Sequence, residues 1–429
     1  MESSTIALII IGIMMILYIS ELLPIATTSI LACLALAIFG VVPFRVALGG
    51  FGENIVFLIV GMVVVGDALF ETGVAGLVGK KIISWVGTNE RKFIGALFVV
   101  IIPISAFLSN TATVAMTLPI AERSIAHSNG KLLKKNIYMI IGLISVVGGG
   151  LTIVGSTPQL IAQGLLINSG LRPIGFFELS LMGLPIVALL AVYVLTFGHS
   201  FKKKIFNFPE VEDHTHEMHS ESSGETKKRT NVEIARMFIS VAVLVFCVVG
   251  FIVELWTLGI VAMVGAMVCV VTGCISQQKV FQKMNWTTIV IMGCSFGVAA
   301  GLDYSGAGVM IAQGMIGILG DSMTPWLLCA VLALAAVIFT NFMSSTATAA
   351  LLIPIAAIVG VELGYDVRSL VMAVAIAANI GYATPISTPP ITMTLVGGYR
   401  FMDYVKFGGL FNLMAYILVV LLFPLVLNI

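Results

Sequence analysis

Two stretches of hydroxyl-bearing residues interrupt otherwise apolar sequence, one in each half of the 429-residue chain. They cover residues 109–121 and 344–356, and eight of their thirteen aligned positions are identical. The polar groups at their starts belong to Ser109, Asn110, Thr111, Ser344, Ser345 and Thr346. Where a helix restarts after a break, its free N–H groups and positive dipole end suit an anion. The pair therefore indicates an anion site built from both halves of the chain.

A second pair of breaks follows these stretches. Residues 148–158 and 384–390 combine glycine, hydroxyl residues and proline in the middle of apolar runs. Irregular backbone at membrane depth is tolerated only where protein or a water-filled cavity satisfies it. Carbonyls freed near Gly155 and Ser387 are hard oxygen ligands suited to an alkali cation. We therefore expect all four breaks to converge near the membrane midplane.

None of the four breaks contains Lys, Arg or His. A multiply charged anion would have no cationic side chain to balance it there, and an unpaired charge in a dry cavity is very costly. Cations that bind together with the anion supply that balance, which predicts coupling to sodium. The breaks also lack Asp and Glu, so a carboxylate proton relay is not indicated.

The composition identifies the class of protein. The chain is 59% hydrophobic and 10% charged, with a mean hydropathy of +1.10, whereas a soluble domain is about 25% charged. The apolar runs are continuous rather than alternating, which favours membrane-spanning helices over a β-barrel. We expect an all-α, multi-pass protein of the cell membrane, of the bacterial inner-membrane type. Its surroundings are the lipid bilayer, and no nucleic-acid partner is expected.

The apolar runs predict two repeats, each with five membrane-crossing elements and one re-entrant hairpin. Residues 1–199 form the first repeat, 200–233 a solvated cytoplasmic linker, and 234–429 the second repeat. The predicted spans are 4–20, 22–42, 54–72, 137–169, 176–198, 234–253, 256–274, 285–303, 367–398 and 408–428. The predicted hairpins are 93–123 and 323–358, and the predicted interfacial helices are 73–90 and 306–321. Each hairpin arm is expected to be shorter than the roughly 20 residues of a full crossing.

An odd number of crossings per repeat turns the second repeat upside down. The basic residues support this inversion: with both termini outside, 19 of the 22 Lys and Arg residues fall on the cytoplasmic side. Only Arg45, Arg172 and Arg368 fall outside. That bias is typical of a membrane protein with this orientation.

The paired hairpin tips and the paired Pro-rich breaks resemble those of the divalent anion/sodium symporter family, within the ion transporter superfamily. The resemblance covers nearly the whole chain. It implies dicarboxylates or citrate as the usual substrates, and sulfate in some branches. It also implies a homodimer and an elevator-type movement of a transport domain, containing the broken helices, against a scaffold.

By motif position, the resemblance also implies roles for individual residues. One sodium site would use Ser105, Ser109, Asn110 and Gly155. A second would use, mostly through backbone carbonyls, Thr340, Met343, Ser345 and Ser387. The substrate carboxylates would meet Ser109, Asn110, Thr111, Ser344, Ser345, Thr346, Thr388 and Pro389.

Three positions depart from the family pattern. Ser345 stands where the second tip usually has Asn, and Gln159 and Ile391 stand where Asn often follows the proline turn. These changes leave the identity of the substrate and the second sodium site open. The family's exchangers carry cationic side chains in the cation sites, and this chain has none there. Symport is therefore favoured over exchange.

The expected function is sodium-coupled symport of a small di- or tricarboxylate. Transport of sulfate or another oxyanion, or carboxylate exchange, are the alternatives within the family. A cation/proton antiporter would need a midplane carboxylate, and an enzyme would need a catalytic constellation at depth. The breaks offer neither. The linker histidines His214, His216 and His219 could bind a transition metal but are read as incidental.

Overall fold

The computed structural model describes residues 2–426 except 21, 75, 76, 78–88, 129, 209–229, 254 and 320–323. The elements of the first half are α1 (Ser3–Ser20), α2 (Ile25–Ile38), α3 (Phe44–Ala47), η1 (Gly49–Gly52), α4 (Asn54–Glu71), α6 (Glu90–Phe107), α7 (Asn110–Ala126), α8 (Lys134–Gly149), α9 (Thr157–Asn168), α10 (Ser180–Leu195) and α11 (Phe197–Ile205). Those of the second half are α12 (Asn231–Ile252), α13 (Leu258–Val271), α14 (Gln277–Lys283), α15 (Trp286–Ser305), α16 (Ala307–Leu319), α17 (Pro325–Phe342), α18 (Ser345–Leu363), α19 (Val367–Ala378), α20 (Pro389–Thr392), η3 (Met393–Gly397) and α21 (Phe401–Val426).

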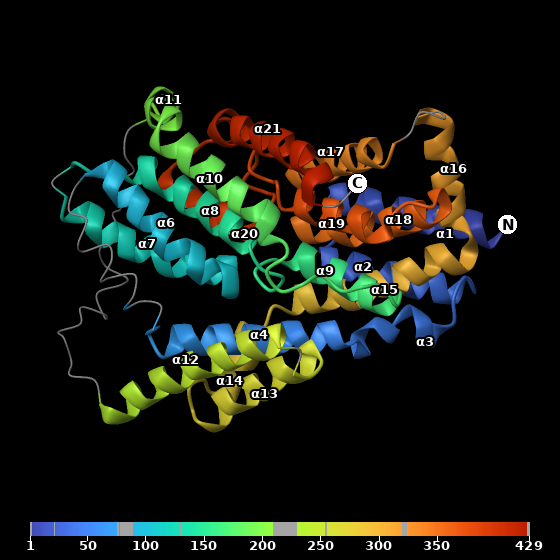
Figure 1. Ribbon diagram of the computed structural model, residues 1–429, viewed down its shortest axis with the longest axis horizontal. Helices are drawn as coiled ribbons and strands as arrows, with labels where there is room; N and C mark the ends of the chain where they lie inside the picture. The colour runs from blue at the N-terminus through green and yellow to red at the C-terminus, as the bar shows by residue number, and fades with distance from the viewer. Residues whose placement is uncertain are drawn as a thin grey trace.

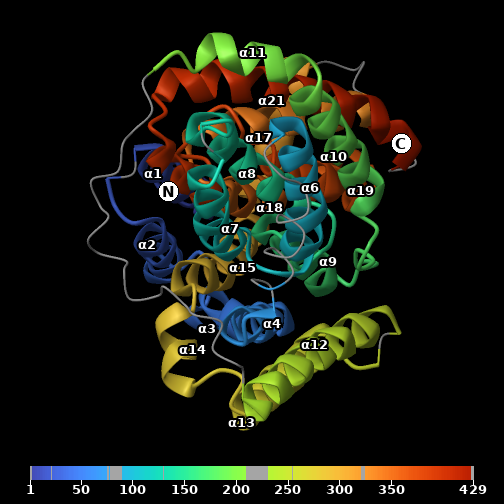
Figure 2. The ribbon, with the colours of Figure 1, turned by 90° about the vertical axis from the view of Figure 1, so that its left-hand side faces the viewer.

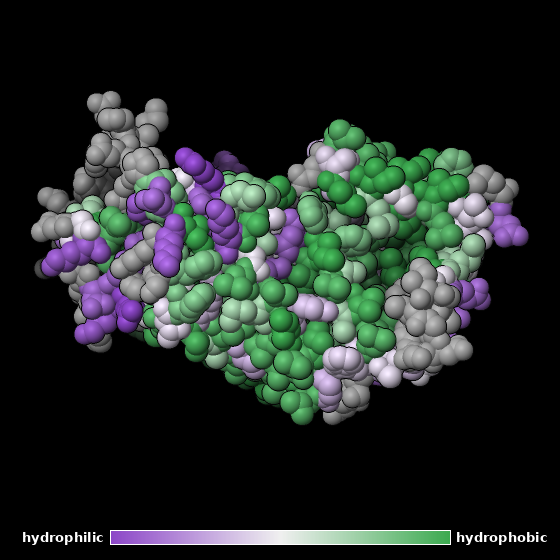
Figure 3. Space-filling model, turned by 90° about the horizontal axis from the view of Figure 1, so that it is seen from above, coloured by the Kyte–Doolittle hydropathy of each residue, from purple (hydrophilic) through white to green (hydrophobic). Residues whose placement is uncertain are grey.

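Each of the ten predicted spans coincides with helix in the structure. Seven helices among the described residues are long and apolar enough to cross a membrane. They are α1, α4, α12, α15, α17, α18 and α21. Hydrophobic residues cover much of the face seen in Figure 3, and hydrophilic residues gather toward its left-hand end. The prediction of a multi-pass, all-α membrane protein is confirmed. The predicted interfacial helix 73–90 lies largely outside the described residues.

Helices α4, α12, α13 and α14 form a layer along one side of the remaining bundle (Figures 1 and 2). Small residues let this layer pack closely: a Cβ at Gly61 of α4 would lie 2.5 Å from the Ala262 carbonyl carbon of α13. Inside a membrane, close contact between helices at small residues replaces the hydrophobic effect as the source of association.

The two predicted hairpins are present as α6/α7 and α17/α18, and in Figure 1 they lie toward opposite ends of the molecule. Only Leu108 and Ser109 separate the first pair, and Met343 and Ser344 the second. The arms have 18, 17, 18 and 19 residues, each slightly shorter than the roughly 20 residues of a full crossing, as expected. Two-residue turns leave almost the whole of each apolar stretch free to be helical. Inversion of the second half stays a prediction.

The broken spans pack reciprocally on the hairpins. Helix α9, which follows the first break, contacts α18 and α19 of the second half. Helix α20, which follows the second break, contacts α7 and α8 of the first half. Each half therefore packs on one helix of the other half's hairpin.

Helix α11 corrects the prediction that a polar, solvated linker begins at residue 200. It continues to Ile205 and packs against α10 and α21 (Figure 2). The Lys202 side chain is fully buried, and its Nζ lies 2.5 Å from Glu90 Oε1 at the start of α6. Asn136 Nδ2 donates to Glu90 Oε2 at 3.1 Å. The run of lysines looked solvated in the sequence, but one of them has a buried carboxylate partner.

Replacing Lys202 with Met is expected to destabilise the protein by about 3 kcal/mol, because the Glu90 carboxylate would lose its buried counter-charge. Thermal unfolding in detergent measures the effect. Lys204→Met, at an exposed position of the same helix, is the matched control. Adding Glu90→Gln to Lys202→Met should restore part of the loss, and equal stability of Lys202→Met and the wild type would contradict the role of the pair.

An ion pair also joins the two halves, between the segment that links α9 to α10 and the start of α19. Arg368 pairs with Glu178 and donates from Nε to the Arg172 carbonyl at 3.2 Å. Arg172 and Arg368, both predicted on the outer side, are thus neighbours.

Candidate functional site

The first cluster of polar groups surrounds Asn110, the first residue of α7. Its amide nitrogen, oriented by its partners, lies 2.6 Å from Ser105 Oγ, 3.2 Å from the Gly155 carbonyl oxygen and 3.3 Å from the Ser145 carbonyl oxygen. Ser105 Oγ donates to that Ser145 carbonyl at 2.7 Å, and Ser145 Oγ donates to the Asn110 carbonyl at 2.9 Å. Neutral oxygens from the hairpin and from both sides of the first break therefore surround the Asn110 amide nitrogen, and hydroxyl and carbonyl oxygens are the kind of ligand that an alkali cation takes.

Two glycines make this convergence possible. A Cβ at Gly149 would lie 2.4 and 2.5 Å from the two terminal atoms of the Asn110 amide. A Cβ at Gly155 would lie 2.4 Å from the Gly149 carbonyl oxygen. Gly148 is less crowded, since a Cβ there would lie 3.1 Å from Ile102 Cα. The glycine run thus serves close packing and also makes room for the Asn110 side chain.

The second cluster lies at the other hairpin tip. The Ser345 backbone N–H donates to the Ser387 carbonyl at 3.1 Å, and Thr340 Oγ1 donates to the Ala378 carbonyl at 2.9 Å. A Cβ at Gly381 would lie 2.8 Å from Ser387 Cβ and 3.1 Å from Thr340 Oγ1. Of the four residues predicted for the second sodium site, Thr340 and Ser387 therefore border Gly381, and Ser345 is bonded to Ser387. The fourth, Met343, is fully buried at the end of α17.

Asn341 orients the backbone of the second break. Its Oδ1 accepts from the Ala383 N–H at 3.0 Å, and its Nδ2 donates to the Val337 carbonyl at 2.7 Å. Its own carbonyl accepts from Thr384 Oγ1 at 2.7 Å. These hydrogen bonds satisfy irregular backbone at membrane depth. We therefore expect Asn341 to hold the shape of the break, and the neighbouring residues to supply the groups that bind a ligand.

The two breaks meet directly. Ser156, just before α9, hydrogen-bonds through Oγ to Asn379 Oδ1, just after α19. Asn379 Nδ2 donates to the Ala375 carbonyl at 3.0 Å, which fixes the amide. This contact joins the predicted sodium clusters of the two halves into one structure.

The residues predicted to meet the substrate differ in exposure. Ser109 and Pro389 are exposed, and Thr111, Ser344 and Thr346 are half-buried. Ser344 Oγ accepts from the Ala347 N–H at 3.2 Å and so caps α18. Thr388 is 6% exposed, and its Oγ1 has no hydrogen-bond partner within the described part of the chain. A buried hydroxyl without a partner is costly, so Thr388 is suited to hydrogen-bonding a ligand.

Ser145 is the residue of the first cluster that the sequence motifs did not predict. It lies on α8, four residues before Gly149, and therefore on the same face of that helix. A lone hydroxyl one turn before a glycine, in an otherwise apolar helix, is the signal that could have identified it. The helix that carries it is buried on all sides, so its sequence pattern alone does not show which face meets the hairpin.

Around these clusters the structure supplies helix N-termini and neutral oxygens. The described residues contain no group of three or more His, Cys, Asp or Glu side chains that could hold a metal ion. The histidines of the linker, His214, His216 and His219, lie outside the described residues. Dipoles, hydroxyls and carbonyls of this kind bind small anions and alkali cations.

Comparisons with known proteins show what this chain is similar to. The family model described as "Citrate transporter" matches residues 15–369. The sodium-dependent dicarboxylate transporter SdcS of Staphylococcus saprophyticus is 24% identical over 94% of this chain and 82% of its own length. An uncharacterized transporter of Methanocaldococcus jannaschii is 26% identical over 93% of this chain and 88% of its own length. The crystal structure of the Alcanivorax borkumensis YdaH transporter shares the fold, with a TM-score of 0.51, 14% identity, and coverage of 90% of this chain and 88% of that one.

Proposed function

The chain belongs to the citrate transporter family, and from this premise we propose that it is a secondary active transporter that symports a small di- or tricarboxylate with sodium. The reciprocal packing of α9 on α18 and of α20 on α7 carries the proposal. It would bring the four helix breaks together, with a cluster of neutral oxygens at each hairpin tip. No Lys, Arg or His lies in the described segments 105–111, 148–158, 340–346 and 379–392. A carboxylate bound there needs accompanying cations.

The roles of individual residues follow from their surroundings. The first sodium would bind among Ser105, Ser109, Asn110 and Gly155, where the structure adds the Ser145 carbonyl. The second would bind among Thr340, Met343, Ser345 and Ser387. The carboxylates would meet the free N–H groups of α7 and α18 and the Thr388 hydroxyl. The name of the Staphylococcus saprophyticus relative, a sodium-dependent dicarboxylate transporter, supports this choice of ion and substrate.

We further propose that the two hairpins and the broken spans move together as the transport domain of an elevator. The Ser156–Asn379 contact ties the breaks of the two halves to each other. The layer of α4, α12 and α13 lies to one side of this body and would be the static scaffold of a homodimer (Figure 2). Two inverted repeats, at 1–199 and 234–429, account for the matching order of hairpin, broken span and final helix.

Uptake into proteoliposomes tests the proposal. Labelled succinate, malate, fumarate, citrate and sulfate are supplied with an inward sodium gradient, with equal sodium on both sides, and with choline. Uptake of a carboxylate that requires the gradient is the expected result. Competition between succinate and sulfate separates the two substrate classes. Uptake that depends on internal carboxylate and not on sodium would show an exchanger instead.

Changing Ser345 to Asn is expected to strengthen the second sodium site. An added side-chain oxygen contributes about 1 kcal/mol, so the sodium concentration for half-maximal uptake should fall about fivefold. Titrating uptake against sodium measures the change. Ser124→Asn, at a half-buried position of α7 away from the tip, is the matched control. Unchanged sodium and carboxylate dependence would mean that position 345 contributes no ligand.

A further inference from the structure

Gln159, the third residue of α9, has a buried side-chain oxygen that accepts no hydrogen bond from the described residues. Its side chain is 1% exposed. Its Oε1 has no hydrogen-bond partner within the part of the chain that the structure describes. The nearby Gln163 shows the usual arrangement: Oε1 accepts from the Ile174 N–H at 2.6 Å and Nε2 donates to the Ile174 carbonyl at 3.2 Å. A buried amide oxygen without a donor is costly, so Gln159 indicates a ligand.

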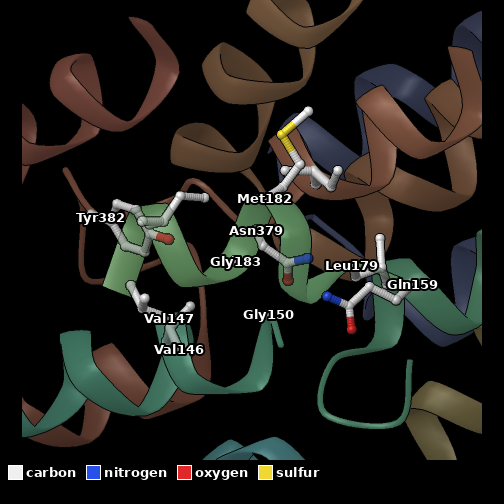
Figure 4. A pocket seen from close by; sticks show the side chains of 11 residues that line it. Val146, Val147, Gly150, Gln159, Leu179, Met182, Gly183, Asn379 and Tyr382 are labelled. Atoms are coloured by element: carbon white, nitrogen blue, oxygen red, sulfur yellow. The ribbon is translucent and has the colours of Figure 1, made fainter. Parts of the chain in front are cut away.

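A cavity lies beside Gln159, between the two breaks and α10 (Figure 4). Its lining includes Gly150, Gln159, Met182, Asn379 and Tyr382. In Figure 4 the amides of Gln159 and Asn379 lie near one another, and the Tyr382 ring lies farther along the cavity. The cavity has a volume of about 20 Å³. One water molecule needs about 10–15 Å³ by this measure, so the cavity has room for one water.

The lining residues of the cavity indicate which kind of ligand it can hold. The orphaned atom is an acceptor, so the ligand must present a hydrogen or a positive charge. None of the eleven lining residues is charged, and most are apolar. A bare ion would lack a counter-charge in such a lining. Water is the small neutral donor that fits, and it has acceptors on both sides, at Gln159 Oε1 and Asn379 Oδ1.

We propose that this cavity binds one water molecule and that Gln159, through it, positions Asn379 and hence the hydrogen bond between Asn379 and Ser156 that joins the two breaks. Gln159 is thus a positioning residue for transport. Its role in transport rests on the proposed function, whereas the hydration of the cavity does not.

Radiolytic labelling of the purified full-length protein tests the hydration. X-ray pulses convert bound water into hydroxyl radicals, which oxidise the adjacent side chains even when bulk solvent cannot reach them. Met182 and Tyr382 line the cavity and are 1% and 2% exposed. Met139, also 1% exposed and not among the lining residues, is the internal control. We expect Met182 and Tyr382 to be oxidised several-fold faster than Met139, and Met182 to fall to the Met139 rate in Gln159→Leu.

Equal rates for Met182 and Met139 in the wild type would overturn the proposal. Labelling of Met182 that disappears when sodium replaces choline would also overturn it, because an alkali cation and not water would then occupy the cavity in the working protein. Gln159→Asn keeps the amide and leaves space for water, so it should retain the labelling that Gln159→Leu loses. Because labelling requires no substrate, it can be interpreted even if the chain transports no carboxylate.

The transport measurement isolates the positioning role. Gln159→Leu should raise the KM for the carboxylate about fivefold, the effect of one neutral hydrogen bond, with little change in the maximal rate. Gln159→Asn should recover most of the wild-type KM. If Gln159→Leu loses maximal rate with KM unchanged, or if Gln159→Asn does not recover KM, the residue has only a structural role and the positioning role is rejected.

Discussion

Sodium-driven uptake is expected to be abolished by Asn110→Ala, while the protein remains folded. Asn110 is the residue on which the oxygens of Ser105, Ser145 and Gly155 converge. Loss of groups that orient a metal's ligands commonly weakens binding by about 10–100-fold, and Asn110 is itself a predicted ligand of sodium and substrate. The variant should therefore show no gradient-dependent uptake at sodium concentrations that saturate the wild type.

Two measurements separate a lost site from a lost fold. Thermal unfolding of Asn110→Ala should change by the order of the two hydrogen bonds that its amide can donate, about 1–3 kcal/mol, and its elution from a sizing column should match the wild type. Asn168→Ala removes the same side chain from an exposed position at the end of α9 and should transport normally. Sodium-driven uptake by Asn110→Ala at the wild-type rate would remove the first sodium site from the mechanism.

The second large effect is expected from Gly149→Ala, which adds one methyl group and removes no polar group. That methyl would lie within 2.4–2.5 Å of the Asn110 amide, a distance that real contacts do not allow. Either Asn110 moves away from the first cluster or α8 shifts from the hairpin, at about 1–3 kcal/mol for such overpacking. In both cases the cluster is lost, so uptake should fall nearly as far as in Asn110→Ala.

Gly95→Ala is the matched control for this variant. Gly95 lies within α6, the helix of the first hairpin that packs on α8, but a Cβ there meets nothing within 4 Å. Gly95→Ala should transport at the wild-type rate and, if anything, stabilise α6 slightly. Uptake by Gly149→Ala that equals uptake by Gly95→Ala would contradict the geometry of the first cluster.

Much of the architecture could be predicted because its signals are local. Hydroxyl residues, glycine and proline inside apolar runs mark where helices stop, and the structure breaks the chain at Ser109, Ser344 and the two proline-rich segments. The family expected from these motifs is confirmed by the match over residues 15–369. The sodium and substrate roles of individual residues stay predictions.

Other features depend on contacts that no local pattern reports. The place of Ser145 in the first cluster follows from the packing of α8 on α6, and the burial of Lys202 follows from where Glu90 lies in space. These are properties of the tertiary arrangement, and they become visible only when distant segments are side by side.

The absence of charged side chains at the described breaks has an electrical consequence. A fixed charge moved across the membrane responds to its potential by about 2.3 kcal/mol per 100 mV. If the hairpins and broken spans move as proposed, the empty binding region carries no such charge across. Any response to voltage would then come only from the bound substrate and sodium ions. A dicarboxylate and two sodium ions together carry no net charge, so their transport would not depend on the membrane potential. Each additional sodium ion would add a positive charge, and the membrane potential would then contribute to accumulation of the substrate.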